Sequence, residues 1–313
     1  MNKTMLLLIL ALLPFGTVNA AEPKKGLTLI DLTDEFAATW DRTRALPDTE
    51  RVAAMKKGME PLVPGFYSHE RLNLPTSERY DRNVLAALER YPEERAQIAE
   101  VSRRFSALLA PAQASFEAKF GPMTDYPPIY LVHSLGEFDG GTRDLPGGGV
   151  LMFGADMIAR LHLRHDIRPF FHHELFHLYH VRSFDNCDAI WCGLWTEGLA
   201  TYVAASLNPG ATDAELLLDF PEPIRPMVEK DRAAAVCAVV SRLDSTEQKD
   251  AVALFSTDRL APDLPPRFGY YVGYLAAAEM AKEHDLNTLA TMKSGEVRPR
   301  LASALQRLAT CKS

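Results

Sequence analysis

The sequence predicts an α+β protein that is mostly helical and has one small mixed sheet. Three observations predict this class. Nonpolar residues recur every three to four positions over residues 29–119 and again after Pro169, as in amphipathic helices. Short β-branched and aromatic runs lie between these segments, at 127–135 and from Val150 onward. The composition, 47% hydrophobic and 24% charged, is that of a folded protein.

The first twenty residues are typical of a cleaved secretory signal. Lys3 precedes a nonpolar run from Met5 to Leu13, and a small-x-small cleavage pattern ends at Ala20. The run is much shorter than the roughly 20 residues that span a bilayer, and no later segment is long and nonpolar enough. We therefore expect residues 1–20 to be a signal peptide and the mature protein to be soluble and exported, either periplasmic or secreted.

The charge of the chain argues against a nucleic-acid partner. The formal net charge of −7 at pH 7 becomes −8 when Lys3 is removed with the signal. A protein that binds nucleic acid normally carries a basic stripe, which an acidic chain of this kind does not suggest.

The cysteine count is even, which in an exported chain favours disulfides with three possible connectivities. The cysteines are Cys187, Cys192, Cys237 and Cys311. Pairing of the closest two would close a short loop and stabilise the fold by about 2 kcal/mol on the chain-entropy model. A distant partner for Cys192 is an alternative. Zinc ligation by cysteine is disfavoured, because it competes with disulfide formation in an oxidising compartment.

The region over residues 21–125 is predicted to be helical. Helical signals begin at Leu29, and "DEFAATWDRTRAL", "DTERVAAMKKGME" and "SERYDRNVLAALERY" each have the spacing of a helix. A longer helical pattern over residues 92–120 should bend near Pro111, because proline removes a backbone hydrogen bond. Residues 64–75 are expected to form a loop.

The region over residues 126–313 is predicted to hold the sheet and a helical C-terminal subdomain. "PPIYLVHSL" predicts a strand, the glycine-rich "EFDGGTRDLPGGG" predicts a loop, and "VLMFGADMIARL" begins as a strand and ends as a helix. Residues 169–182 form the next predicted helix, with Pro169 suited to its first turn. "LWTEGLATYVAASL" predicts another, and the C-terminal third is mostly helical.

The segment "RPFFHHELFHLYH" contains a His-Glu-x-x-His pattern on its predicted helix. His173 and His177 are four residues apart, so both imidazoles can reach one metal ion from the same helix face. Glu174 would lie beside that ion, where it could take a proton from a metal-bound water. The alternative is a buried helix whose histidines only form hydrogen bonds in the core.

The other two histidines of this segment do not fit the same ion. His180 lies seven residues beyond His173, about 10.5 Å along the helix axis. Zinc–nitrogen bonds are only about 2.0–2.1 Å long, so one ion cannot bind both ends of this stripe. His172 points roughly 100° away from His173. Structural roles, or positions at the rim of the site, are expected for both.

A catalytic zinc site needs a third protein ligand, and Glu197 is the preferred candidate. It follows His177 by twenty residues and lies on a second predicted helix, in "LWTEGLATY". Gly198 and Ala200 would allow this helix to approach the histidine helix closely. The alternative is a surface acid, but the nonpolar neighbours of Glu197 argue against full exposure, and a buried acid needs a partner.

The pattern His173-Glu174-x-x-His177 followed by Glu197 resembles the gluzincins, the thermolysin-like zinc metallopeptidases. "WTEGLATY" looks like the helix that carries their third ligand, above all in bacterial predicted zinc-dependent proteases and M1-type peptidases. The resemblance covers roughly residues 128–290. It implies a zincin-like fold, with a small sheet above the metal-binding helix, a helical C-terminal subdomain and one bound Zn²⁺ ion.

Two further features of the resemblance concern the substrate. "YYVGY" is similar to the segment in which these peptidases carry a tyrosine that stabilises the transition state, which implies this role for Tyr270, with Tyr271 as the alternative. "GGGVLMFGAD" stands where the family has an edge strand that pairs with an extended substrate. The chain lacks the Gly-x-Met-x-Asn motif of M1 aminopeptidases and has Thr201 where thermolysin has an aspartate.

The sequence therefore predicts an exported zinc metallopeptidase that hydrolyses a peptide or protein substrate and is not an aminopeptidase of the M1 type. Zinc would be held by His173, His177 and Glu197, Glu174 would be the general base and Tyr270 would assist the oxyanion. Two alternatives are a non-catalytic zincin-fold module that binds peptides and a zinc hydrolase of a non-peptide amide or ester.

Overall fold

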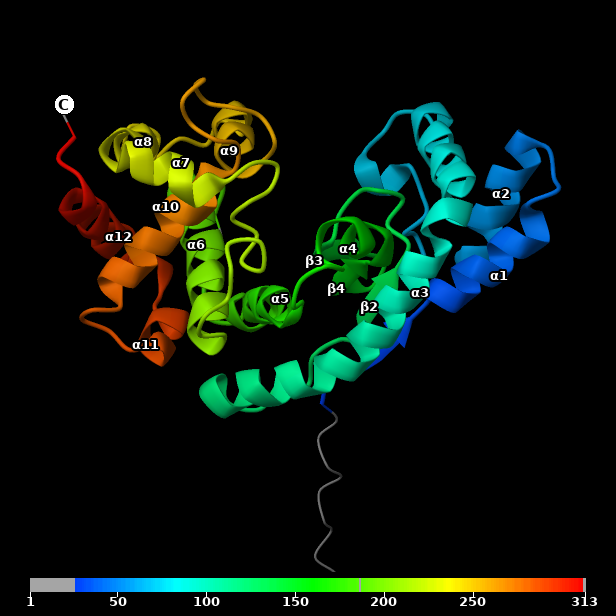
Figure 1. The fold of residues 1–313 in the computed structure, drawn as a ribbon, viewed down its shortest axis with the longest axis horizontal. Helices are drawn as coiled ribbons and strands as arrows, with labels where there is room; N and C mark the ends of the chain where they lie inside the picture. The colour runs from blue at the N-terminus through cyan, green and yellow to red at the C-terminus, as the bar shows by residue number, and fades with distance from the viewer. Residues whose placement is uncertain (1–25, 186, 312–313) are drawn as a thin grey trace, which may run out of the picture.

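A computed structural model of the protein describes residues 26–185 and 187–311, so the expected signal peptide lies outside the described residues. The chain is a mixed α+β protein with one four-stranded sheet and many helices. Figure 1 shows two lobes: the sheet with the N-terminal helices on one side, and the C-terminal helices on the other. The helices of the first part of the chain are α1 (Thr33–Thr43), α2 (Asp48–Met59), η1 (Glu70–Leu72), α3 (Glu78–Phe120) and α4 (Ala155–Leu161).

The C-terminal lobe begins with α5, which lies next to the sheet lobe, and helices are its only regular secondary structure over the described residues. Its helices are α5 (Arg168–His180), α6 (Ile190–Leu207), α7 (Ile224–Lys230), α8 (Arg232–Val240), α9 (Gln248–Phe255), α10 (Phe268–Met280), α11 (Leu286–Thr291) and α12 (Ser294–Leu308). The predicted helical C-terminal third is confirmed.

The sheet has the strand order β1-β2-β4-β3, so β1 and β3 form its two edges. The strands are β1 (Leu29–Asp31), β2 (Ile129–Val132), β3 (Gly140–Leu145) and β4 (Gly148–Gly154). β1, β2 and β4 are parallel, whereas β3 runs antiparallel to β4. The sheet is therefore mixed, as the sequence predicts.

Two strands occur where the sequence predicts other structures. Residues 29–31 form β1 instead of starting a helix, because this short segment pairs with β2. Residues 140–145 form β3 instead of a loop, because a tight turn with positive φ at Gly147 and Gly148 folds them back onto β4. The prediction that "GGGVLMFGAD" holds an edge strand is also wrong. This segment forms β4, an interior strand, and β3 is the edge strand.

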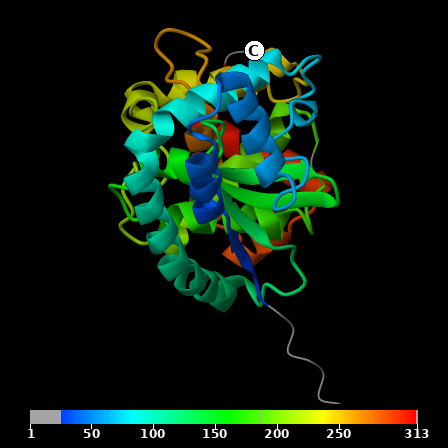
Figure 2. The same cartoon turned by 90° about the vertical axis from the view of Figure 1, so that its right-hand side faces the viewer.

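The N-terminal helices are predicted correctly in type but not in extent. The two expected helices over residues 77–91 and 92–120 form one helix, α3, which contains both Pro92 and Pro111. Figures 1 and 2 show that α3 changes direction as it passes along the side of the sheet. Because β1 precedes α1 and pairs with β2, the N-terminal region shares the sheet with the rest of the chain. The boundary expected at residue 125 stays a prediction.

An aromatic cluster fixes α5 against the sheet. Phe153 of β4 lies with its ring centroid 5.7 Å from that of Phe171 and 5.6 Å from that of Phe170, both on α5. Phe105 of α3 contacts the same cluster, 4.4 Å from Phe171. All four side chains are buried. Burial of aromatic side chains of this size contributes strongly to the core, so the histidine helix has a rigid support.

All four cysteines form disulfides, Cys187–Cys192 and Cys237–Cys311. The closest-pair connectivity is thus observed, and cysteine ligation of a metal is ruled out for these residues. Two disulfides are typical of proteins from oxidising compartments, which agrees with the expected export. Within the described ranges, every helix is too short or too polar to cross a membrane.

Candidate metal centre

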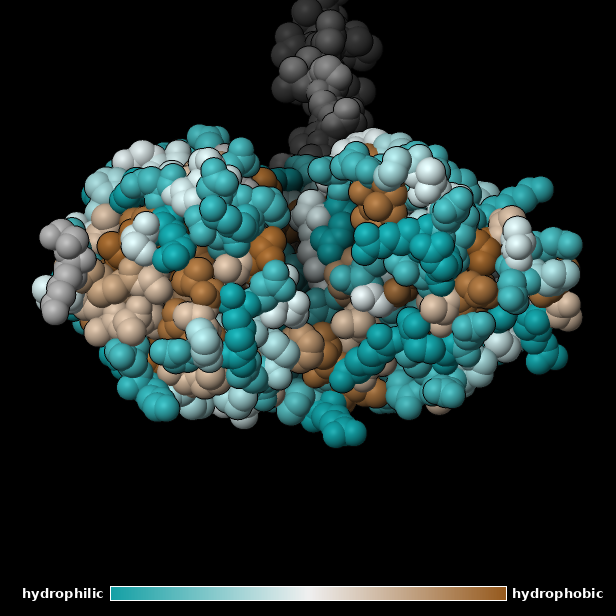
Figure 3. All heavy atoms as spheres, turned by 90° about the horizontal axis from the view of Figure 1, so that it is seen from above, coloured by the Kyte–Doolittle hydropathy of each residue, from teal (hydrophilic) through white to brown (hydrophobic). Residues whose placement is uncertain are grey.

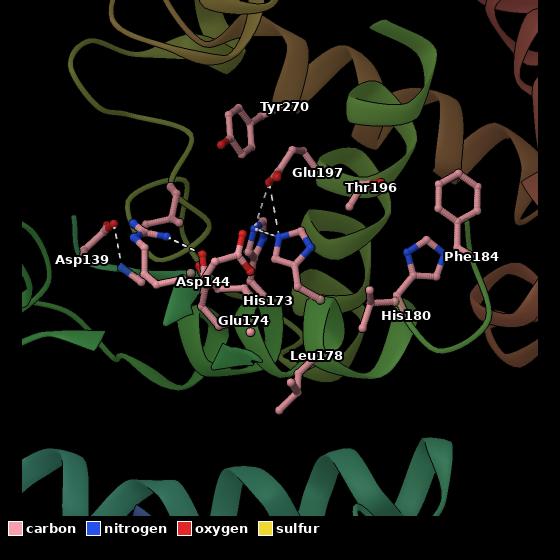
Figure 4. Close-up of a pocket in the computed structure, with 18 of the residues that line it drawn as sticks. Asp139, Asp144, His173, Glu174, Leu178, His180, Phe184, Thr196, Glu197 and Tyr270 are labelled. Carbon is pink, nitrogen blue, oxygen red and sulfur yellow. Dashed lines mark hydrogen bonds and ion pairs between the residues drawn. The ribbon is translucent and has the colours of Figure 1, made fainter. Parts of the chain in front are cut away.

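A cavity of about 660 Å³ lies between the sheet and the C-terminal helices. Figure 3 shows the hollow between the two lobes from above, and Figure 4 shows the residues around it. Its walls come from β3, from one face of α5, from α6 and from the start of α10. His173, Glu174, His177, Glu197 and Tyr270, the five site residues predicted from the sequence, all line this cavity. Segments as much as 130 residues apart in the chain therefore meet here.

Three of these residues converge on one point. His173 Nε2 lies 3.0 Å from His177 Nε2, and Glu197 Oε2 lies 3.3 Å from the first and 3.4 Å from the second. The two histidines point from consecutive turns of α5, and Glu197 comes from α6, which packs against it. The three side chains can hold a metal ion.

The spacing of these atoms fits a tetrahedral ion of the size of zinc. Ligands about 2.0–2.1 Å from such an ion lie about 3.3–3.4 Å from one another. The three observed separations, 3.0, 3.3 and 3.4 Å, are close to this value. Two imidazoles and one carboxylate are also a common donor set for catalytic zinc, in which a fourth position stays open. The residues present therefore fit the ion that the sequence motif implies.

The charges of the three groups depend on one another. Burial alone would raise the pKa of Glu197, but the neighbouring His177 and His173 hold it well below its usual range. Burial lowers the pKa of His173, so this imidazole is neutral. Burial would also lower the pKa of His177, but Glu197 outweighs this effect and raises it to about 9. A cation at this point would displace the proton of His177, because metals bind neutral imidazole.

Glu174 lies beside the three ligand atoms without joining them. Its side chain is buried, and Oε2 has no hydrogen-bond partner among the described residues. Burial raises the pKa of its carboxyl to about 7, while His177 opposes the shift. Gly140 of β3 lets the strand approach this carboxyl, since a Cβ there would lie 2.9 Å from Glu174 Cδ. A buried carboxyl with a free oxygen and this pKa is suited to exchange protons with a ligand in the cavity.

The structure separates the two tyrosine candidates. Tyr270 lines the cavity with its ring 6.4 Å from that of His173, and Figure 4 shows it above Glu197. Burial raises the pKa of Tyr270, so its hydroxyl keeps its proton and can donate a hydrogen bond. Tyr271 instead points towards α7, where its hydroxyl donates to Glu229 Oε1 at 2.6 Å. Tyr270 is therefore the tyrosine that can reach a ligand at the metal centre.

The two other histidines of α5 lie outside the group of ligands. His172 Nε2 contacts Ser115 Oγ at 2.8 Å, and His172 Nδ1 contacts Asn208 Nδ2 at 2.7 Å, so this residue joins α5 to α3 and to the end of α6. His180 is buried and stacks between Phe176 and Phe184 at the far end of the cavity. Burial lowers its pKa to about 3, so it is uncharged.

The position of Glu197 depends on a close crossing of α6 and α10. A Cβ at Gly198 would collide with the backbone of Gly273, and a Cβ at Gly273 would collide with the carbonyl oxygen of Leu194. The sequence predicts that Gly198 serves the approach of α6 to the histidine helix, and this is wrong. Gly198 faces α10 instead. Its close contact with Gly273 fixes the position of α6 and therefore the position of Glu197 relative to α5.

Replacement of Gly198 by alanine should therefore separate α6 from α10 and displace Glu197. We expect a loss of about 1–3 kcal/mol in the free energy of unfolding, as for other overpacked cores, together with weaker metal binding. Thermal unfolding and titration with zinc measure the two effects. Gly295→Ala is the matched control, since a Cβ there meets no atom within 4 Å. A Gly198→Ala protein with unchanged stability and zinc affinity would contradict this role.

Several cavity residues are not predicted from the sequence. Arg143 on β3 and Arg267 at the start of α10 both line the cavity, as does Asp139, which contacts His162 Nε2 at 2.8 Å. The signal that could have revealed Arg267 is its neighbour Tyr270, three residues on. Arg143 could be found only after residues 140–145 are recognised as a strand.

Comparisons of the chain with models of protein families, with curated proteins and with solved structures returned no match. The case for a function therefore depends on the geometry of the site.

Proposed function

We propose that the protein is an exported, zinc-dependent metallopeptidase with a zincin-like arrangement of sheet and metal-binding helix. The observation that carries this proposal is the convergence of His173, His177 and Glu197 at near-tetrahedral spacing, with the unpartnered carboxyl of Glu174 beside them. A site that only stabilised the fold would have no need of such a base. The edge strand β3 and the open cavity give a substrate access to these groups.

His173, His177 and Glu197 would hold the zinc ion. When bound, zinc lowers the pKa of a water ligand towards 7 and polarises the carbonyl group of a substrate. Glu174 would take the proton of the attacking water and then deliver it to the leaving amine. Its pKa of about 7 suits both steps, because the group can accept and release a proton near neutral pH.

Tyr270 would stabilise the oxyanion of the tetrahedral intermediate. Its protonated hydroxyl can donate a hydrogen bond as negative charge develops on the carbonyl oxygen. An extended peptide could pair with the outer edge of β3, because β3 is an edge strand of the sheet. This arrangement would place a peptide bond across the centre of the cavity.

The proposal is tested by removal and return of the metal. The purified protein, without residues 1–20, is assayed with a mixture of fluorogenic peptides before and after treatment with a strong chelator. We expect hydrolysis to fall by about 100-fold or more and to recover on addition of one equivalent of zinc, because the uncatalysed water is a far weaker nucleophile. Hydrolysis that persists in protein freed of metal would overturn the proposal.

A further inference from the structure

Two arginine side chains line the cavity, and among the described residues neither forms an ion pair with a carboxylate. Arg143 comes from the edge strand β3 and Arg267 from the residue that precedes α10. Each guanidinium donates one hydrogen bond to a backbone oxygen: Arg143 Nη1 to Thr142 O at 2.9 Å and Arg267 Nη1 to Phe220 O at 3.1 Å. Each therefore has several donors left over.

Arg267 is held in place next to the proposed catalytic groups. Its guanidinium lies 4.7 Å from the centroid of the Tyr270 ring, and its positive charge opposes the rise in the pKa of Tyr270. The backbone of Arg267 is in the left-handed region, with φ 61° and ψ 14°. This conformation costs a residue other than glycine or asparagine about 1–2 kcal/mol. An arginine at such a strained position beside a cavity suggests a functional use of its side chain.

Arg143 is held in a similar way on the side of the sheet. Its guanidinium lies 3.9 Å from the centroid of the Phe138 ring and is half-buried. Arg143 and Glu174 line the same cavity; burial lowers the pKa of Arg143, and the charge of Glu174 opposes this shift. A guanidinium that is partly removed from water gains most from an anionic partner.

Several acids in or next to the cavity already have partners, whereas Glu174, the proposed general base, has an oxygen without a hydrogen-bond partner among the described residues. Asp139 contacts His162, and Glu137 forms an ion pair with Arg71 at 2.6 Å. Glu197 faces the two histidines. Asp144 follows Arg143 on the strand, is exposed to solvent and lines the same cavity. Arg143 and Arg267 thus keep guanidinium donors that can bind an incoming anion, although the protein as a whole is acidic.

We propose that Arg143 and Arg267 form a carboxylate subsite, which selects peptides that carry an acidic group near the bond to be cleaved. The group is either the C-terminal carboxylate or the side chain of an aspartate or glutamate. Arginine is suited to this task because its planar donors bind both oxygens of a carboxylate. This inference rests on the proposed peptidase function for its substrate, but the subsite can be tested by binding alone.

The probes are N-terminally fluorescein-labelled hexapeptide mixtures of uncharged residues in three forms. One ends in an amide, one ends in a free carboxylate, and one ends in an amide but contains a single glutamate. Dissociation constants are measured by fluorescence anisotropy in zinc-loaded Glu174→Gln protein, which should retain the peptides uncleaved. We expect one or both acidic forms to bind about 10- to 100-fold more tightly than the amide form, the usual effect of hydrogen bonds to a charged group. The acidic form that binds more tightly shows whether the subsite prefers a C-terminal carboxylate or an acidic side chain.

The decisive variant combines Arg267→Asn and Arg143→Gln. Asparagine tolerates the left-handed backbone, so we expect thermal unfolding to change little. The preference for acidic peptides should disappear, while binding of the amide form stays the same. Arg298→Asn with Arg300→Gln on α12 removes the same charge far from the cavity and should keep the preference. Equal binding of all three forms by the parent protein, or an unchanged preference in the arginine variant, would overturn the subsite.

The same peptides separate this inference from the proposed function. Cleavage by the wild-type protein is followed in parallel by mass spectrometry. If no form is cleaved although the acidic forms bind preferentially through the two arginines, the peptidase function fails and the subsite stands. If cleavage occurs without any preference for acidic peptides, the peptidase function stands and the subsite fails.

Discussion

Glu174→Gln is expected to reduce peptide hydrolysis by about 100- to 10,000-fold, the usual effect of the loss of a general base. Glutamine has nearly the same shape as glutamate but cannot accept a proton from the attacking water. The carboxyl of Glu174 has no hydrogen-bond partner at Oε2 and contributes no ligand atom to the group of three. The zinc content of the variant should therefore stay at one equivalent. The measurements are kcat/KM on the fluorogenic peptides and metal analysis of the same sample.

The matched control for this experiment is Glu296→Gln. Glu296 lies in the first turn of α12, far from the cavity, and its replacement should leave hydrolysis unchanged. Full activity in the Glu174→Gln protein would contradict the proposed mechanism. A joint loss of activity and zinc would show instead that Glu174 supports the metal.

His177→Ala is expected to abolish the stoichiometric binding of zinc and, with it, hydrolysis. The variant leaves one imidazole and one carboxylate, which are too few to hold a catalytic zinc ion tightly. Zinc at about 100 times its dissociation constant should stabilise the wild-type protein by about 2.7 kcal/mol, because it binds only the folded state. The variant should show no such gain. Thermal unfolding with and without zinc measures the difference.

His165→Ala is the control for the loss of a histidine. His165 lies in the loop before α5, and the hydrogen bonds described for it are made by its backbone oxygen and its backbone N–H. This variant should bind zinc and respond to it as the wild type does. Retention of one tightly bound zinc ion by His177→Ala would contradict the proposed ligand set.

The local parts of this site can be predicted from the sequence. His173, Glu174 and His177 lie on one helix, and a four-residue spacing determines their relative directions whatever the rest of the fold does. Glu197 lies twenty residues beyond His177, and the resemblance of its segment to a known ligand helix makes it a candidate. The structure brings its carboxylate to the two histidines.

The parts that depend on distant contacts cannot be predicted in this way. β1 is too short to give a strand pattern, with only three residues, and β3 is rich in glycine and polar residues, which are uncommon in strands. Both exist because their neighbours offer backbone partners. The contact between Gly198 and Gly273 joins segments 75 residues apart, and nothing near either glycine indicates its partner.

The most direct test of the central claim is a crystal structure of the zinc-loaded protein, with anomalous diffraction recorded on both sides of the zinc absorption edge. We predict one anomalous peak, bound by His173 and His177 of α5 and by Glu197 of α6. A strong zinc peak bound by other residues, or no peak at these three side chains in crystals that contain zinc, would contradict the claim.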